Sequence, residues 1–397
     1  MKFVTTELSV VGKKGDEHVV VTDLITVQAL DRSFFGTEFD GKKTQIELTP
    51  EEALYLIDVR NAKCHAKKKE LSFNAVAAKF QNNPKFLARY FCFKDWRDRG
   101  LIARPIDEAD ANANYGRSPL QKYPCKPSDF PEVKAKGLFF SDDLMSIIDD
   151  DVEGQALYEK NWFGQWGTYK AKKHGRFLKL DAYETLFLMK HACFVLNVKE
   201  KKLVKDATAR RSDFPALYSV YEDWRLRGFV VKTGFKFGTH FRLYFPGASP
   251  GLGEGEWMHS KHVIHVFPRE ARMLISEWAR AIRVAHGVRK TFILAIPGAK
   301  RVEASELDFL LYHRESAGSV PENPRTGKPK FVMLALSEEE ELGGAELARG
   351  LEQAKQLGLD LVLAICDRET SITYYRVKRI ELPGSKYEYY EIEWIQP

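Results

Sequence analysis

The sequence predicts a multi-domain protein of the α/β (α+β) class, built from two kinds of small domain that each occur twice. Three observations predict it. The chain has 397 residues, too many for one ordinary hydrophobic core. Three blocks recur in the first part of the chain with their order and approximate spacing kept, and a longer stretch recurs further on without a gap.

The first repeat predicts a small helix-rich α/β domain, here called N-type. In each copy an N-cap residue, Thr49 or Asp181, opens an amphipathic helix. A second helix ends at Gly100 or Gly228 and leads into an apolar strand. The repeated blocks are QALDRSFFG (28–36) with QALYEKNWFG (155–164), LTPEEALYLI (48–57) with LDAYETLFLM (180–189), and LARYFCFKDWRDRGLIAR (87–104) with PALYSVYEDWRLRGFVVK (215–232).

The second repeat predicts a mixed-sheet domain, here called C-type. Residues 261–296 align with 330–365, and both end in the triplet LAI. Each copy is expected to form a strand, a helix and a strand. In the first copy Leu274, Trp278, Ile282 and Ala285 keep helical spacing and should face a sheet. TFILAI (291–296) is expected to be a buried strand.

Polar residues differ between the two C-type copies, while the fold-forming residues persist. This pattern indicates that one copy holds the chemically reactive residues and the other is a scaffold. The differing pairs are His259 and Lys328, Arg283 and Glu352, His286 and Lys355, and Lys290 and Leu359.

Composition limits the function classes. The net charge of +6 permits a nucleic-acid partner without requiring one. No apolar run could span a bilayer, no secretory signal pattern is present, and the five scattered cysteines form no Cys-x-x-Cys. We therefore expect a cytoplasmic protein without a membrane partner.

The run MHSKHVIHVF (258–267) could supply metal ligands through His259, His262 and His265. On a strand, however, side chains alternate, so His259 and His265 would share one face and His262 would occupy the other. We expect no metal site here.

Three motifs carry a resemblance to a known family. YEDWRLRGFVVKTGFKFGTHFRLY (221–244), HSKHVIHV (259–266) and HGVRKTFILAI (286–296) resemble the tRNA-splicing endonucleases, most closely the archaeal enzymes. The half–whole–half order of the repeats looks like the three-unit archaeal form. In that form a catalytic unit is fused to the separated halves of a structural unit, and two chains pair as a homodimer.

The resemblance implies domain boundaries. They are a degenerate N-type domain (1–105), a proline-containing linker (106–137), the N-type domain of the catalytic unit (138–240), the catalytic C-type domain (241–315), a second linker (316–329) and a degenerate structural C-type domain (330–397).

The resemblance also implies the chemistry. The family's Tyr, His and Lys fall on Tyr244, His259 and Lys290, and the RNA's own 2′-hydroxyl attacks the adjacent phosphate without metal or cofactor. His259 would be the acid, since imidazole titrates near ~6.5. Tyr244 would be the base, with Lys290 stabilising negative charge. The connection between Tyr244 and His259 is longer and richer in glycine than is usual in the family.

Other residues are candidates for contacts with RNA or a second chain. In the family, an Arg at the position of Arg283 stacks on a splayed base, and Arg301 is a candidate for the second such residue. Lys160 and the insert lysines Lys170, Lys172 and Lys173 could form an RNA contact or a plain basic hairpin. Asp367 and Glu369 match the family's acidic dimer loop, or form an ordinary turn.

The leading hypothesis is therefore a homodimeric tRNA-splicing endonuclease that cleaves precursor tRNA folded as a bulge–helix–bulge. Cleavage would leave 2′,3′-cyclic phosphate and 5′-hydroxyl ends. One alternative is a non-catalytic structural subunit of such an enzyme. Another is a metal-dependent nuclease, which would need clustered carboxylates that do not flank His259 and Lys290.

Overall fold

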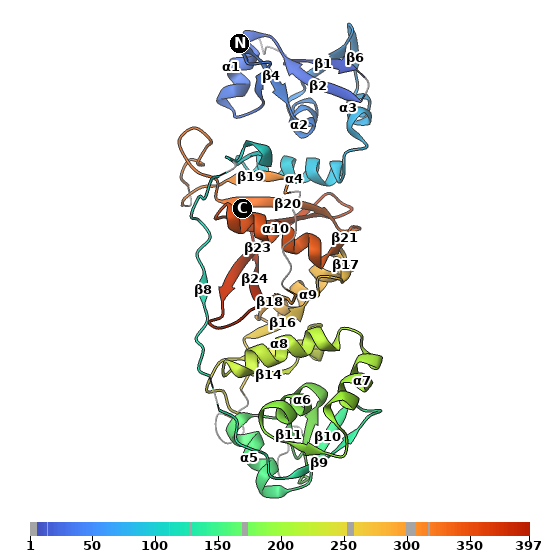
Figure 1. Ribbon diagram of the computed structural model, residues 1–397. Helices are drawn as coiled ribbons and strands as arrows, with labels where there is room; N and C mark the ends of the chain where they lie inside the picture. The colour runs from blue at the N-terminus through green and yellow to red at the C-terminus, as the bar shows by residue number, and fades with distance from the viewer. Residues whose placement is uncertain are drawn as a thin grey trace.

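The computed structural model describes residues 6–397 except Lys14, Ala111, Ser128, Ala317 and the segments 169–173, 252–257 and 299–306. The molecule is elongated, with an N-terminal unit at one end, a large sheet in the middle and a second small unit at the other end (Figure 1). Within the described residues, no helix is long and apolar enough to cross a membrane. Arg301, Lys170, Lys172 and Lys173 lie outside the described residues.

The N-terminal unit combines a mixed sheet with four helices in its described residues. The strands lie in the order β3-β4-β2-β1-β5-β6, with β1 antiparallel to β2 and parallel to β5. They are β1 (Glu7–Lys13), β2 (Asp16–Val21), β3 (Thr37–Phe39), β4 (Lys42–Leu48), β5 (Lys63–Ala66) and β6 (Lys69–Leu71). The helices are α1 (Leu24–Arg32), α2 (Pro50–Arg60), α3 (Phe73–Phe80) and α4 (Phe86–Asp98).

The second small unit has a related plan. Its strands lie in the order β11-β12-β10-β9-β13. They are β9 (Lys136–Phe140), β10 (Met145–Ile148), β11 (Gln165–Trp166), β12 (Leu178–Asp181) and β13 (Val195–Leu196). The helices are α5 (Asp151–Asn161), α6 (Ala182–His191), α7 (Glu200–Arg210) and α8 (Phe214–Leu226).

Capping residues begin the central helix of each unit, as the sequence predicts. Thr49 accepts a hydrogen bond from the Glu52 backbone at 3.2 Å, and the Glu52 carboxylate accepts one from the Thr49 backbone at 3.0 Å. Asp181 and Glu184 form the same reciprocal pair at the start of α6. Each box satisfies two backbone N–H groups that the helix itself leaves unpaired.

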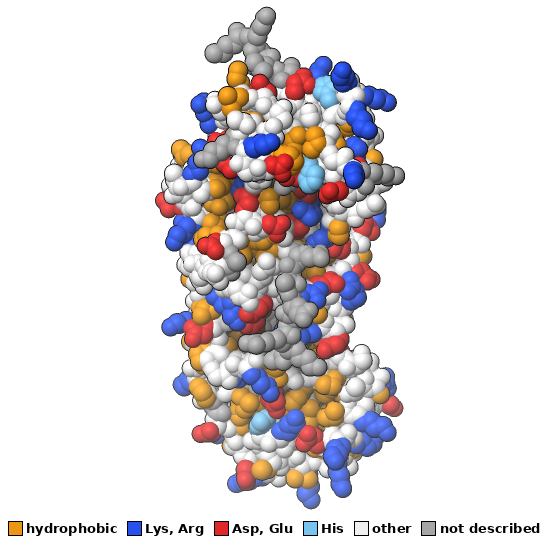
Figure 2. Space-filling model, turned by 45° about the horizontal axis from the view of Figure 1, so that its top comes forward, with side chains coloured by type: hydrophobic (Ala, Val, Ile, Leu, Met, Phe, Trp, Pro, Cys, Tyr) orange, Lys and Arg blue, Asp and Glu red, His pale blue; other side chains and the backbone are white. Residues whose placement is uncertain are grey.

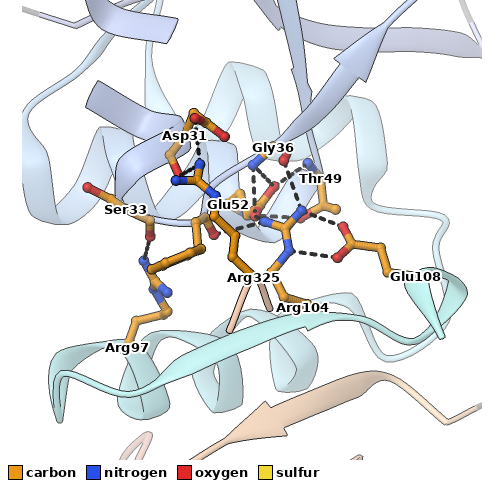
Figure 3. Close-up of polar contacts among 10 residues, drawn as sticks. Asp31, Ser33, Gly36, Thr49, Glu52, Arg97, Arg104, Glu108 and Arg325 are labelled. Carbon is orange, nitrogen blue, oxygen red and sulfur yellow. Dashed lines mark hydrogen bonds and ion pairs between the residues drawn. The ribbon is translucent and has the colours of Figure 1, made fainter. Parts of the chain in front are cut away.

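A buried ion pair joins the capping glutamate to the strand that follows each unit. In Figure 3, Arg104 donates to Glu52 at 2.8 Å and to the Gly36 carbonyl at 2.8 Å. In the second unit, Lys232 donates to Glu184 at 2.6 Å and to the Gly164 carbonyl at 2.9 Å. Different cations thus perform the same structural task in the two units.

The middle of the molecule is a large mixed sheet that collects strands from distant parts of the chain. Its order is β14-β15-β16-β18-β24-β23-β22-β20-β19-β7, with β8 beside β23. The strands are β7 (Ile102–Pro105), β8 (Gln121–Lys122), β14 (Val230–Thr233), β15 (Phe241–Tyr244), β16 (His262–Val266), β18 (Thr291–Ile296), β19 (Phe309–Tyr312), β20 (Phe331–Ser337), β22 (Asp360–Cys366), β23 (Ile372–Glu381) and β24 (Glu388–Ile395).

The two halves of this sheet have the same pairing pattern. On one side, β16 and β18 are parallel neighbours joined by α9 (Ile275–Gly287). On the other side, β20 and β22 are parallel neighbours joined by α10 (Gly344–Gln356). The predicted strand, helix and strand of each C-type copy are therefore confirmed. The halves meet where β23 pairs antiparallel with β24.

Three strands pair outside the domain ranges that the sequence suggested. β7 and β14 fall within the N-type ranges, yet each extends the large sheet at one edge. β19 falls within the range of the catalytic C-type domain, yet it pairs with β20 and β7 in the other half. Hydrogen bonding across the sheet thus links segments that the chain order separates.

Helices cover both faces of the large sheet. α4 and α8 pack on one face, where the Trp96 ring lies 5.5 Å from Tyr374 and the Trp224 ring lies 4.8 Å from Tyr389. α9 and α10 pack on the sheet in a separate core. Trp278 and Ile282 of α9 and Leu351 of α10 are among its buried residues. The chain is a mixed α/β protein with several sheets.

The predicted linker 106–137 lies against the C-terminal part of the chain as an extended strap (Figure 1). β8 pairs with β23, and Tyr123 is buried with its hydroxyl on the carboxylate of Glu391. Arg117 pairs with Glu322, and the Ser118 hydroxyl donates to Asp360 at 2.6 Å. This segment is therefore bound along much of its length.

Candidate active site

Tyr244 is the last residue of β15 and is almost fully buried. Its ring packs at 4.6 Å between centroids against Trp162, which ends α5 in a left-handed conformation. Its hydroxyl accepts a hydrogen bond from Nη1 of Arg242 at 3.2 Å. Arg242 and Tyr244 are two residues apart on one strand, so their side chains share a face.

Lys290 directly precedes β18 and is fixed by a turn at the end of α9. Its backbone N–H donates to the Ala285 carbonyl at 2.9 Å. Its ammonium donates to the Ser260 hydroxyl at 3.0 Å and also to the Ser260 carbonyl, and lies 4.7 Å from the centre of the Phe237 ring. Burial, followed by the charge of Arg242, lowers the pKa of Lys290.

His259 is exposed and lies one residue before Ser260. β16 begins at His262, so His259 precedes the strand and does not share a strand face with His265. The two parallel strands β16 and β18 start in register, with His262 opposite Thr291. The segments that carry His259 and Lys290 therefore lie at the same end of these two neighbouring strands. The Lys290 ammonium donates to Ser260, the residue beside His259.

Arg242 is the residue that connects this cluster, and the sequence interpretation missed it. It donates to Tyr244, its charge acts on Lys290, and its Nε donates to the Thr233 carbonyl at 2.8 Å. A signal was present in the chain. The strand FRLY (241–244) and the strand FLLY (309–312) occupy matching places in the two halves of the sheet, and Leu310 stands where Arg242 would be.

Of the remaining histidines of the run, His262 is half-buried and His265 is buried. Burial, followed by the charges of Lys261 and Lys290, lowers the pKa of His262 to about 4. His265 is 6 % exposed and lies beside His240. Among the described residues, no group of three or more His, Cys, Asp or Glu side chains is arranged to hold a metal ion.

The other candidate residues lie on other elements. Arg283 is exposed on α9, and Lys160 is exposed near the end of α5. Asp367 accepts hydrogen bonds from the backbones of Glu369 and Ser371, each at 2.9 Å, within the turn between β22 and β23. The Asp367 carboxylate therefore holds its own turn together, and Glu369 is exposed.

Comparison with known proteins places this chain in a family. Residues 214–304 match the catalytic C-terminal domain of tRNA intron endonucleases, and residues 139–208 match the N-terminal domain. A protein of Methanopyrus kandleri named tRNA-splicing endonuclease is 32% identical over 166 residues, which are 40% of this chain and 88% of that protein. This chain belongs to the tRNA intron endonuclease family.

Other tRNA-splicing endonucleases are similar in the same region. The protein of Thermococcus kodakarensis is 35% identical over 160 residues, covering 39% of this chain and 85% of that protein. The protein of Methanococcoides burtonii is 28% identical over 206 residues, and the match covers 50% of this chain but only 55% of that protein. The chain thus spans about half of the longer relative, and it contains a tRNA intron endonuclease catalytic domain.

Proposed function

We propose that this chain is a tRNA-splicing endonuclease that cuts precursor tRNA at the bulge–helix–bulge junctions between intron and exon. The observation that carries the proposal is the cluster where β15 ends and where β16 and β18 begin. The Tyr244 phenol accepts a hydrogen bond from the Arg242 guanidinium, whose charge also acts on the Lys290 ammonium. That ammonium donates to Ser260, which directly follows the exposed His259. The proposed reaction requires a base, an acid and positive charge around one phosphate.

In the proposed mechanism the 2′-hydroxyl loses its proton to Tyr244, and its oxygen forms a bond to the adjacent phosphorus. The bond from phosphorus to the 5′-oxygen breaks, and that oxygen takes a proton from His259. Lys290 opposes the negative charge of the crowded phosphorane, and Arg242 stabilises the Tyr244 phenolate that accepts the proton. The products are a 2′,3′-cyclic phosphate and a 5′-hydroxyl, and the step uses no metal or cofactor.

The two sheet halves support an internal duplication as part of the proposal. The matching strand patterns and the matching ion pairs Arg104–Glu52 and Lys232–Glu184 fit one ancestral unit present twice. The C-terminal half holds Leu310 and Leu359 in place of Arg242 and Lys290. We infer that this half, with the N-terminal unit, is the framework. The domain ranges given above remain part of this proposal.

The proposed assembly is a homodimer with one active site per chain. The exposed carboxylate of Glu369 would contact the second chain of the dimer. Asp367 would stabilise the turn that presents it, through its hydrogen bonds with the backbones of Glu369 and Ser371. Arg283 would hold a splayed base, and the roles of Lys160, Arg301 and the lysines of 169–173 in RNA binding belong to the same proposal.

One assay tests the proposed function. Purified protein is incubated with intron-containing precursor tRNA in excess chelator. Cleavage that leaves cyclic-phosphate ends supports the proposal. Cleavage that requires added magnesium would support a metal-dependent nuclease instead, and RNA that is bound but stays intact would support a non-catalytic structural subunit.

A further inference from the structure

A hollow of about 250 Å³ lies between the end of α5, the turn after α8 and the loop that follows β15. Its charged lining side chains are Lys126, Lys160, Arg225 and Glu159, so positive charge exceeds negative charge. Lys126, Lys160 and Glu159 are exposed, whereas Arg225 is 3 % exposed. On the face of the molecule that Figure 2 shows, by contrast, basic and acidic side chains are interspersed.

Arg225 is a buried cation without an ion-pair partner among the described residues. Its guanidinium donates to the Phe229 carbonyl at 3.2 Å and to the Asn161 carbonyl at 3.0 Å, while its Nε has no acceptor in that part of the chain. Burial lowers the pKa of Arg225. Burying a charge without a counterion is costly, so an anion bound in the hollow would be favourable.

The acidic groups nearby are already engaged elsewhere. Glu184, which acts on Arg225 through its charge, accepts the hydrogen bond from Lys232 at 2.6 Å. Asp181 caps α6. Glu159, at the rim of the hollow, accepts a hydrogen bond from Gln155 at 3.0 Å. Arg225 therefore keeps a net attraction for an external anion.

The strap is held at this hollow by a close backbone contact. The Lys126 N–H donates to the Arg227 carbonyl at 3.0 Å. A Cβ at Gly228 would meet the Lys126 carbonyl oxygen at 1.8 Å, so glycine is required for this approach. The backbone of Lys126 is thus fixed at the edge of the hollow.

The hollow also adjoins Tyr244. Val230, which lines it, pairs directly with Tyr244 across β14 and β15. Asn161, also in the lining, precedes Trp162, on which the Tyr244 ring packs. The lining continues two residues beyond Tyr244 with Pro246. An RNA strand whose scissile phosphate lies at Tyr244 would bring a neighbouring phosphate to this place.

We propose that this hollow binds a backbone phosphate of the RNA, one that flanks the scissile position. The ligand class follows from the uncompensated guanidinium with two lysines around it, since Arg and Lys are the usual phosphate contacts. The inference that this phosphate belongs to RNA rests on the proposed function. A phosphate held there would fix the register of the strand relative to Tyr244.

The test combines neutral phosphates with protein variants, using full-length protein and precursor tRNA that carries a 2′-deoxy nucleotide at the cleavage position. A methylphosphonate, which lacks the phosphate charge, is placed in turn at each nucleotide flanking that position. We expect one substitution to weaken binding to the wild type by about tenfold. In Lys126→Ala/Lys160→Ala the same substitution should have no further effect, while Lys69→Ala, an exposed lysine on β6, should respond as the wild type does.

Arg225 is tested separately because its substitution can disturb folding. Arg97 serves as the matched control, since it donates to the Ser33 carbonyl at 2.7 Å (Figure 3). Its guanidinium lies 4.1 Å from the centre of the Phe35 ring, as that of Arg225 lies 4.0 Å from the centre of the Phe163 ring. If both Arg→Lys variants lose stability but only Arg225→Lys loses the methylphosphonate effect, the proposal holds.

Equal methylphosphonate effects in the wild type, in Lys126→Ala/Lys160→Ala and in Arg225→Lys would overturn the phosphate site. If the wild type still cleaved precursor tRNA in that case, the proposed function would stand without it. Wild-type protein that neither binds nor cleaves the RNA would overturn both.

Discussion

The guanidinium of Arg242 donates a hydrogen bond to the phenol oxygen of Tyr244 at 3.2 Å, across one face of β15. The same guanidinium contributes to the lowered pKa of Lys290. A cation that donates to a phenol oxygen stabilises the phenolate more than the neutral phenol. Arg242 would therefore be a positioning residue that prepares Tyr244 to accept a proton.

Replacing Arg242 should slow cleavage and change its pH dependence. We expect Arg242→Leu to lower kcat about tenfold to a hundredfold and to move the rising limb of the pH–rate profile to higher pH. Arg242→Lys should restore part of both effects because it keeps the charge. A lowered kcat with an unchanged profile in Arg242→Leu would indicate a purely structural role.

Lys290→Ala should remove catalysis and leave binding intact. Its ammonium donates a hydrogen bond to Ser260, the residue next to His259, so we expect a loss of about 10²- to 10⁴-fold in single-turnover rate. Retention of uncleavable precursor tRNA measures binding. Lys261→Ala, at an exposed lysine one residue from Ser260, is the control, and a comparable loss in both variants would contradict the assignment.

The buried histidine pair predicts acid sensitivity. The ring centroids of His265 and His240 lie 4.7 Å apart, and neither ring nitrogen of His265 has a hydrogen-bond partner among the described residues. Burial, followed by the charge of His240, lowers the pKa of His265 to about 3. Burial and the charge of Arg211 lower that of His240 to about 4, against the opposite influence of Asp213.

Because the unfolded chain takes up these protons near pH ~6.5 and the folded chain only at lower pH, stability should fall on acidification. The expected slope is about 1.4 kcal/mol per pH unit for each histidine, between the unfolded and folded pKa values. Urea unfolding across this range measures it. His265→Phe should flatten the slope, whereas the exposed His174→Gln should not. An unaltered slope in His265→Phe would contradict the prediction.

The buried pair of Glu52 and Arg104 predicts a large stability effect. Glu52→Ala leaves the Arg104 guanidinium without its buried partner and removes the acceptor for the backbones of Gly36 and Thr49. We expect the free energy of unfolding to fall by about 3–5 kcal/mol. The control Glu47→Ala removes a partly exposed carboxylate of β4 that pairs with His18, and it should cost far less in urea unfolding. Equal costs would show that the pair contributes little.

Local features of the fold could be predicted from the sequence, because their causes lie within a few residues. The capping boxes at Thr49 and Asp181 and the helix end at Gly228 are such cases. The spacing of Trp278, Ile282 and Ala285 likewise predicted the buried face of α9.

Long-range pairing could not be predicted in the same way. Nothing near β7 or β14 in the chain specifies that each becomes an edge of the large sheet, since that depends on partners far away in sequence. The role of Arg242 also needed the structure, because a lone Arg on a strand usually reads as a solvent-exposed charge. Comparing FRLY with FLLY becomes informative only once β15 and β19 are known to occupy matching places.

The pairing of β7 with β19 has a consequence for biosynthesis. The ribosome makes Ile102 roughly 200 residues before Tyr312, the residue it pairs with. At about 5–20 residues per second, the first-made unit waits ~10–40 s for its docking partner. During that interval the apolar side of α4 and the open strand edge are available to other nascent chains. Overproduction should therefore favour aggregation of incomplete molecules, and slower elongation, which lengthens this interval, should lower the yield of folded protein.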